Sequence, residues 1–204
     1  MKSTRDTLID TAIGLFLGKG YGAVGTAEIC TTAKVNKGTF YHFFPSKSDL
    51  LIAALERYAS LFQSAFSNIA HSDMGPEEKL KALFEVPEKA NFEWRQAHGF
   101  AQGCLVGNMA LELGAFDEAV RLAAQKALGS WRTAVEPIID QLNVAGALTN
   151  VSSAKGARLL ISMIQGGLVM AKTFNEPSYI SEFASASVAA LKTLNHSGRA
   201  GEQR

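Results

Sequence analysis

The chain lacks most of the residue patterns that mark metal proteins, secreted proteins and common enzymes. Its 204 residues include only two cysteines, too few for a disulfide framework, and a reducing compartment would keep both as thiols. It contains no His-x-x-x-His pair, no Cys-x-x-Cys pair and no Gly-rich strand-to-helix phosphate loop. We therefore expect no metal, no cofactor and no enzymatic activity. The four scattered histidines are His42, His71, His98 and His196.

Long apolar segments are missing as well. The longest apolar stretch, residues 159–171, is short for a membrane span and is interrupted by Gln165, Gly166 and Gly167. The N-terminus lacks the apolar region of a signal peptide. We therefore expect a cytoplasmic protein without a membrane partner.

The overall charge is small, with a formal net charge of +1 at pH 7, which does not fit a wholly basic nucleic-acid coat. The positive charge is instead local. Residues 34–47 hold three lysines and no acidic residue, whereas residues 51–204 hold fourteen basic and fifteen acidic residues. A basic segment of this kind suits a site-specific DNA-binding protein, whose affinity falls with salt as counterions are released.

Residues 26–47, TAEICTTAKVNKGTFYHFFPSK, predict two short helices joined by a tight connection. Small or apolar residues at positions 27, 29, 30 and 33 indicate a first helix of about two turns. Asn36 is a strong N-cap residue, so we expect the second helix to begin there and to extend to residue 43, before Pro45. The pattern is typical of a helix-turn-helix for duplex DNA.

The second of these helices has the features that recognition in the major groove requires. Aromatic residues at positions 40, 43 and 44 would anchor it to a core, while its other side carries polar donors. Gly38 lets the backbone approach DNA closely, and Thr39 and Lys37 are the better candidates for base-edge contacts. The donors suited to phosphates are Lys37, Tyr41, His42 and Lys47.

Over residues 4–51 the chain resembles the DNA-binding signature of the tetracycline-repressor (TetR) family. It departs from the family pattern at Val24 and Gly25, where Thr or Ser usually caps the second helix, and at Lys34, where Gly is usual. These departures weaken the case for a phosphate contact from the second helix, for which Lys34 is the candidate replacement. The matching positions are Gly20, Tyr21, Ile29, Val35, the run 37–41, Phe43, Ser46, Lys47 and Leu50.

The DNA-binding residues predicted from the motif and from this resemblance form one set along residues 26–47. Their side chains are polar or basic, apart from the glycine at the point of close approach. The predicted set is Thr26, Lys34, Lys37, Gly38, Thr39, Tyr41, His42 and Lys47.

The rest of the sequence predicts helices and no strand. Apolar residues recur at helical spacing over residues 8–16, and a long helix is expected over residues 47–71. The expected fold is all-α with about nine helices: a three-helix DNA-binding domain at 1–50, an effector-binding and dimerisation domain at 51–195, and a disordered tail at 196–204. The remaining helices are predicted over 76–97, 104–113, 116–143, 153–173 and 177–195.

The last two predicted helices are rich in small residues, among them Gly156, Gly166 and Gly167. Small residues permit close helix approach, which serves either packing within one chain or contact between two chains. The resemblance implies the second role, a homodimer in which these helices pair with those of a second subunit. Two recognition helices about 34 Å apart would then read successive major grooves of a palindromic double-stranded operator.

The resemblance also implies a small-molecule effector in the C-terminal domain. Cys104 stands at the start of a predicted helix, where the helix N-terminus makes a thiol more reactive, and His98 lies six residues upstream. Gly-Cys-Leu at this place resembles the repressors of N-ethylmaleimide reductase within the family, which sense electrophiles through a cysteine. A tight helix start packed with a small apolar residue is the alternative interpretation. Further candidates for the pocket, which plain core packing would equally explain, are Phe62, Trp94, Met109, Trp131 and Met163.

Together these features predict a homodimeric, ligand-responsive transcriptional repressor that an apolar or electrophilic effector releases from its operator. The alternative is a helical small-molecule-binding protein of the same fold without specific operator binding. The departures at Val24, Gly25 and Lys34 are the only sequence features that favour this alternative.

Overall fold

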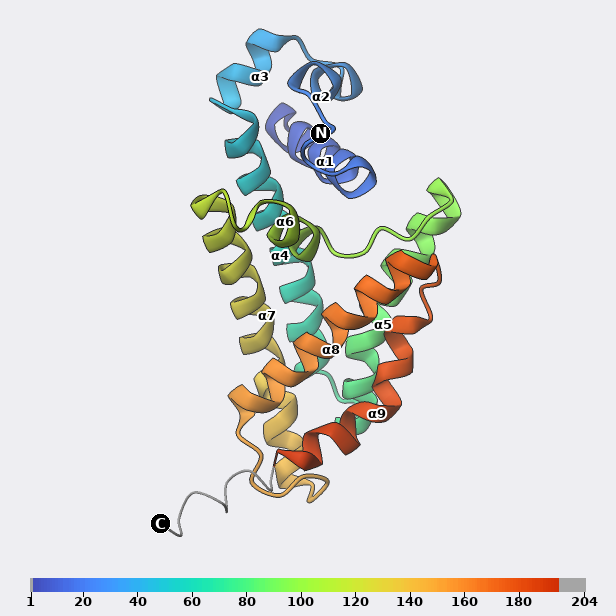
Figure 1. The fold of residues 1–204 in the computed structure, drawn as a ribbon. Helices are drawn as coiled ribbons and strands as arrows, with labels where there is room; N and C mark the ends of the chain where they lie inside the picture. Colours follow the sequence, from blue (N-terminus) through green and yellow to red (C-terminus); the bar gives the residue numbers. More distant parts are fainter. Residues whose placement is uncertain (1, 195–204) are drawn as a thin grey trace. The chain divides into compact units, whose positions relative to one another are not determined.

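The computed structural model describes residues 2–194, and these residues form nine α-helices and no strand (Figure 1). The all-helical fold expected from the sequence is therefore confirmed. The tail predicted at 196–204 lies outside the described residues. In chain order the helices are α1 (Thr4–Lys19), α2 (Thr26–Ala33), α3 (Lys37–Phe43), α4 (Lys47–Ala70), α5 (Pro76–His98), α6 (Leu105–Leu113), α7 (Glu118–Val144), α8 (Ser153–Phe174) and α9 (Tyr179–Thr193).

The contacts between residues divide the chain into two compact units. The first unit comprises the described residues of Met1–Leu61 together with Cys104–Leu128, and the second those of Phe62–Gly103 together with Gly129–Arg204. Helices α4 and α7 each contribute residues to both units. Helix α6 belongs to the first unit, with α1, α2 and α3, whereas the division by function after residue 50 stays a prediction.

Side-chain caps explain where two helices of the first unit begin. At the start of α1, the Ser3 hydroxyl oxygen accepts a hydrogen bond from the N–H of Asp6 at 3.1 Å. At the start of α3, Oδ1 of Asn36 accepts a hydrogen bond from the N–H of Thr39 at 2.7 Å. Each cap satisfies a backbone donor that the helix itself leaves without an acceptor. Asn36 therefore fixes the start of the second helix of the motif, as expected.

The two residues that cap helix α2 are positions where the sequence departs from the family pattern. Its N-cap is Gly25, which has no side chain to offer, and its first turn receives no side-chain cap. Its C-cap is Lys34, whose φ of 57° lies in the left-handed region. A glycine adopts this conformation without steric cost, while a lysine with a Cβ atom does not.

The first unit is built around a continuous apolar core. Helix α1 contacts both α2 and α6, and α2 contacts α3, so the three N-terminal helices share this core with the beginning of α4. Burial of large apolar side chains is the main stabilising contribution to such a unit. The largest of its fully buried side chains are Leu8, Ile9, Phe16, Ile29, Phe40, Leu50, Leu51 and Leu55.

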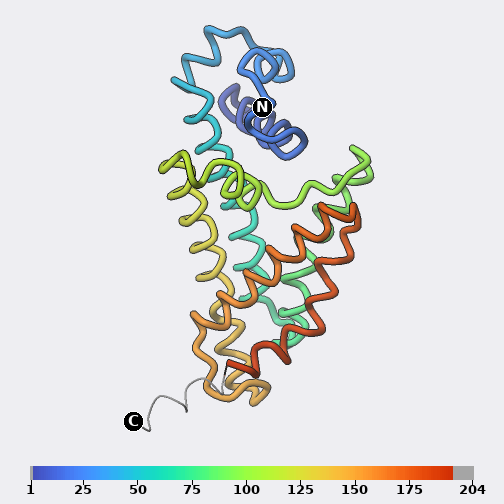
Figure 2. The backbone as a smooth tube through the Cα atoms, in the orientation of Figure 1, coloured from blue at the N-terminus to red at the C-terminus, as the bar shows by residue number. Residues whose placement is uncertain are grey.

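In the second unit, α5, α8 and α9 pack together, and Figure 2 shows α8 and α9 running in opposite directions side by side. Two glycines of α8 allow this close packing. A Cβ atom on Gly167 would lie 2.9 Å from the Cα of Ile180 in α9, and one on Gly156 would lie 3.0 Å from a methyl carbon of Ile139 in α7. At these two positions small residues therefore serve packing within the chain.

None of the helices within residues 2–194 combines the length and the apolar character that crossing a membrane requires.

Candidate nucleic-acid interface

The exposed side of α3 and the connection before it form a polar surface, here called the outer edge, made of Lys34, Lys37, Gly38, Tyr41 and His42. All five residues are exposed, and the Tyr41 side chain has 52% of its surface accessible. Thr26 and Thr39, which were also predicted to contact DNA, are partly exposed. Behind the outer edge, the side chains at positions 40 and 44 are buried, and the ring at 40 packs edge-on against Tyr41 with centroids 5.1 Å apart. The donors of the outer edge thus stand on a rigid apolar base.

Thr39 has a defined hydrogen-bonding state. Its hydroxyl group donates to Oδ1 of Asn36 at 3.1 Å, and the same Oδ1 accepts from its backbone N–H. The hydroxyl oxygen keeps lone pairs that can accept a hydrogen bond, and the γ-methyl group can make an apolar contact. In the major groove these properties fit an amino donor of adenine or cytosine, or the methyl group of thymine.

Lys47, at the start of α4, has a different environment from the lysines of the outer edge. Its Nζ donates to the carbonyl oxygen of Tyr21 at 2.9 Å and to that of Val24 at 2.8 Å. The same nitrogen lies 3.8 Å from the centre of the Tyr21 ring. Burial lowers the pKa of Lys47, while the negative charge of Glu112 favours its charged form. The phosphate contact predicted for Lys47 from the sequence is not tested by these contacts. Because two of its three N–H donors already hold the turn between α1 and α2, we expect the main role of Lys47 to be in that turn rather than at a phosphate.

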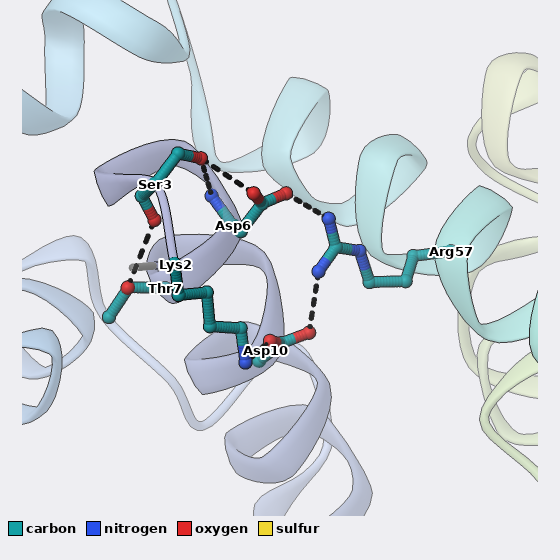
Figure 3. Close-up of polar contacts among 6 residues, drawn as sticks. All are labelled: Lys2, Ser3, Asp6, Thr7, Asp10 and Arg57. Carbon is teal, nitrogen blue, oxygen red and sulfur yellow. Dashed lines mark hydrogen bonds and ion pairs between the residues drawn. The ribbon is translucent and has the colours of Figure 1, made fainter.

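A second polar cluster fastens α1 to α4. Figure 3 shows Arg57 of α4 between two acidic residues of α1: its Nη1 donates to Asp10 at 3.1 Å and its Nη2 pairs with Asp6. Asp6 and Asp10 are one helical turn apart, so one guanidinium group reaches both. Hydrogen bonds from Ser3 and then from Arg57 hold the pKa of Asp6 below its ordinary value. Lys2 also pairs with Asp10.

Reasoning from the sequence missed three residues that organise the first unit: Arg57, Glu112 and Tyr58. The spacing of Asp6 and Asp10 could have indicated a cationic partner, although not which one. Glu112 accepts hydrogen bonds from backbone groups that lie 91 and 90 residues away in the chain. No local pattern signals a contact of that kind.

Cys104 is the N-cap residue of α6, and only 3% of its surface is exposed. The side chain of Tyr58 of α4, which is also buried, is hydrogen-bonded to the side chain of Cys104 and to the backbone of Leu105. Burial, followed by the charge of the Cys104 sulfur, raises the pKa of Tyr58 well above the ordinary value of 10.0. The thiol is therefore placed at a helix start, as expected, but it is covered.

The histidine predicted to assist Cys104 contacts aromatic residues of the second unit. The ring of His98 stacks on Trp94, with centroids 3.9 Å apart and planes 16° apart, and Phe100 lies 6.4 Å from both rings. His98 itself is exposed at the end of α5. The Nε1 atom of Trp94 is buried and has no hydrogen-bond partner among residues 2–194.

The structure brings together some of the apolar residues proposed for an effector pocket. In the second unit the ring of Phe62 lies 5.7 Å from Trp131, and Phe66 lies 6.1 Å and 6.3 Å from these two rings. Met163, also in this unit, is partly exposed. Met109 is fully buried in the first unit. Phe62 and Trp131 are thus in contact with each other, as are Trp94 and His98 among the other predicted effector-site residues.

Two family models match the chain. The model of bacterial regulatory proteins of the tetR family matches residues 8–54, and that of the tetracyclin repressor-like C-terminal domain matches residues 76–187. The chain belongs to the TetR family. The resemblance inferred from the motif is thereby confirmed and extends beyond the DNA-binding segment. TetR-family proteins are transcriptional regulators and not enzymes; they bind operator DNA and usually act as dimers.

Curated relatives include two named regulators. The transcriptional regulator AcuR of Cereibacter sphaeroides is 34% identical over 135 residues, which cover 64% of this chain and 58% of AcuR. The HTH-type transcriptional repressor NemR of Escherichia coli is 30% identical over 124 residues, which cover 60% of each chain. The matched segments thus span less than two thirds of either relative.

Solved structures show the same fold over nearly the whole chain. The regulatory protein TetR from Rhodobacter sphaeroides superposes with a TM-score of 0.78 at 28% identity, covering 90% of this chain and 96% of that one. The reduced form of Escherichia coli NemR gives a TM-score of 0.77 at 23% identity, covering 93% and 95%. This TetR-family chain therefore has the fold of its relatives in both units.

Proposed function

We propose that two copies of this chain form a cytoplasmic homodimer that binds a palindromic operator and represses transcription until a small effector releases it. The observation that carries the proposal is the outer edge, an exposed row of polar and basic residues on a seven-residue helix with buried aromatic side chains behind it. A short helix with this arrangement suits insertion into the major groove. Repression is favoured because a related chain, NemR, is named a repressor.

Each residue of the outer edge has a role that its chemistry supports. Lys34, Lys37, Tyr41 and His42 would bind phosphates, and Gly38 would allow the helix backbone to approach the DNA. Thr39 would read a base edge with its free lone pairs or its methyl group. Thr26, at the first position of α2, would add a phosphate contact through its hydroxyl or backbone N–H.

Binding of the purified protein to the DNA upstream of its own gene tests this proposal. We expect binding at low salt to a defined palindrome, with two chains per site and an affinity that falls steeply as salt rises. Failure to bind any such DNA, whatever the salt concentration, would instead support the alternative of a helical small-molecule-binding protein of the same fold.

The face of α8 that would meet a second chain carries exposed apolar residues around a glycine. Val169 and Phe174 are 52% and 57% exposed, and a Cβ atom on Gly166 would meet no atom of the described residues within 4 Å. Gly166→Arg should therefore fit within one chain but prevent close approach of another. We expect sedimentation equilibrium to show a monomer for Gly166→Arg. The matched control is Gly129→Arg in α7, a helical glycine whose surroundings are equally open; equal dimerisation of both variants would contradict this interface.

Two kinds of effector remain in the proposal. An apolar ligand would bind beside the aromatic cluster of Phe62, Phe66 and Trp131. Met163, a flexible side chain of the same unit, is a further candidate for this site. An electrophile would react with Cys104, whose thiol would add across an activated C=C bond, so that an S–C bond forms and the thiol proton ends on the neighbouring carbon. Because Tyr58 and the helix start cover the sulfur, this reaction requires local opening and has to disturb the start of α6.

N-ethylmaleimide distinguishes these two kinds of effector. If Cys104 is the sensor, the reagent releases wild type and Cys30→Ser from DNA but leaves Cys104→Ser bound. Cys30→Ser is the internal control because Cys30, like Cys104, is a buried thiol of the first unit, 5% exposed. Equal release of all three proteins would make Cys104 a packing residue. Release of none of them would direct the search to reversible apolar ligands.

A further inference from the structure

The turn between α1 and α2, residues 20–25, is held by a side chain from a helix far away in the sequence. The N–H of Tyr21 donates to Oε2 of Glu112 at 3.1 Å, and the N–H of Gly22 donates to Oε1 at 2.7 Å. Glu112 lies in the last turn of α6. Both oxygens of one carboxylate are thus bound to the main chain of the turn that precedes the helix-turn-helix.

Lys47 holds the carbonyl groups of the same turn, because its Nζ donates hydrogen bonds to the oxygens of Tyr21 and Val24. The N–H groups of the turn therefore face an acid from α6, and its C=O groups face a base from α4. We call this arrangement of Glu112, Lys47 and residues 20–25 the inner clamp. Charged partners form stronger hydrogen bonds than neutral ones, although the exposure of Glu112 to water reduces the gain.

Two glycines make room for the carboxylate. A Cβ atom on Gly20 would lie 3.1 Å from Oε2 of Glu112, and one on Gly22 would lie 3.4 Å from Oε1. Gly20 also has a φ of 79°, which residues with a side chain rarely adopt. The turn thus accommodates Glu112 closely on its N–H side.

We propose that Glu112 is a positioning residue for operator binding, through which α6 sets the place of the turn and hence of α2 and α3. This inference rests on the proposed function, because the position of α3 matters only if α3 meets DNA. Helix α6 has nine residues and is about 13 Å long at 1.5 Å per residue. Its other end is Cys104, packed against Tyr58. A displacement at Cys104 that α6 transmits along its length would move Glu112 or break its two hydrogen bonds.

Coupling between two sites is reciprocal. If movement of α6 shifts the turn, then DNA that holds α3 in place must also hold α6. Operator DNA is therefore expected to protect Cys104 from alkylation, and this protection depends on Glu112. DNA that binds the folded protein can slow the alkylation of a buried thiol by mass action alone, so the informative quantity is the change in this protection. If Glu112 merely stabilised the fold, Glu112→Gln would leave the protection by DNA unchanged.

The test measures the rate at which N-ethylmaleimide alkylates Cys104, by mass spectrometry, with and without saturating upstream DNA. It uses Cys30→Ser protein carrying either Glu112 or Glu112→Gln. Glutamine carries an NH2 group, which cannot accept a hydrogen bond, in place of one of the two carboxylate oxygens, and each backbone N–H meets a different oxygen of Glu112. We expect DNA to slow alkylation about tenfold with Glu112 and less than about twofold with Glu112→Gln, and operator affinity to fall about tenfold. Equal protection and equal affinity would overturn the inference.

The matched control is Glu118→Gln, which removes the same charge from an exposed residue of the first unit that pairs with Arg121. Glu118→Gln is expected to show the same protection of Cys104 by DNA, and the same operator affinity, as the protein with Glu112. In protein without DNA, hydrogen exchange at the amides of Tyr21 and Gly22 should be faster in Glu112→Gln, and unchanged exchange would overturn the inference. Failure of the wild type to bind DNA would contradict the proposed function instead, and the exchange measurement would still decide whether Glu112 holds the turn.

Discussion

The outer edge and the inner clamp contain lysines of one short motif but use them differently. Lys37 on the outer edge is exposed, whereas the ammonium group of Lys47, ten residues later, bonds to two carbonyl oxygens and lies over the Tyr21 ring. The outer edge presents donors to a partner, while the inner clamp uses its donors and acceptors on the protein's own backbone. A lysine in a DNA-binding motif is therefore not by itself a DNA contact; the groups that it meets decide its role.

The largest expected difference between the two regions is in stability. Lys47→Met removes the cation from two carbonyl groups of the turn, and we expect the free energy of unfolding to fall by about 2 kcal/mol, since hydrogen bonds to charged groups contribute about 1.5–3 kcal/mol. Lys37→Met, on the outer edge, should change it by less than about 0.5 kcal/mol. Urea denaturation followed by circular dichroism measures both. Equal losses would remove the distinction between the regions.

The hydroxyl group of Tyr58, which lies in α4 beside the start of α6, predicts how the free energy of unfolding depends on pH. The pKa of Tyr58 is raised in the folded protein, mainly by burial, so its contribution is complete below the ordinary value of 10.0 and is lost as the pH rises toward the folded pKa. We expect the free energy of unfolding to fall by about 1.4 kcal/mol per pH unit above 10 from this group. Thermal denaturation of Tyr58→Phe should show a shallower alkaline decline than wild type. The control is Tyr41→Phe on the outer edge, which should decline like wild type.

A change of specificity without a change of stability is expected at Thr39. Thr39→Ala removes the hydroxyl and the methyl contact, so discrimination at one base pair of each half-site should fall by about 1 kcal/mol, the lower end for a base-edge contact. Binding to a set of operators with single substitutions measures this. An unchanged preference at every position would assign base reading to another residue, with Lys37 the next candidate.

The smallest expected effect concerns the strained end of α2. Lys34→Gly relaxes a left-handed backbone and should raise the free energy of unfolding by about 0.5–1 kcal/mol, while removing a cation from the outer edge. We expect stability to rise and operator affinity to fall in the same variant. If affinity stays unchanged, Lys34 does not replace the phosphate contact that the start of α2 lacks.

Much of this division could be predicted from the sequence, because the signals for it are local. Asn36 marks the start of α3, Pro45 follows its end, and apolar spacing indicates all nine helices of the described residues within a few positions. The exposure of Lys37 and Tyr41 also follows from the helical pattern around the buried ring at position 40.

The rest depends on contacts between distant segments. Nothing near Glu112 in the sequence indicates that its carboxylate meets the N–H groups of Tyr21 and Gly22. The sequence likewise places Cys104 at a helix start but does not show that Tyr58, from another helix, covers it. Gly167 was a candidate for contact with a second chain, yet the backbone of α9 fills the space beside it. Residue type predicts which groups are available, and tertiary packing decides which partners they meet.

The salt dependence of operator binding tests the contrast between the two regions most directly. The slope of log affinity against log salt concentration should be measured for wild type, Lys37→Ala and Lys47→Ala on the same upstream DNA. Loss of one phosphate contact reduces the slope by about 0.9. The account predicts this reduction, per subunit, for Lys37→Ala and an unchanged slope with weaker binding for Lys47→Ala. A reduced slope for Lys47→Ala together with an unchanged slope for Lys37→Ala would contradict it.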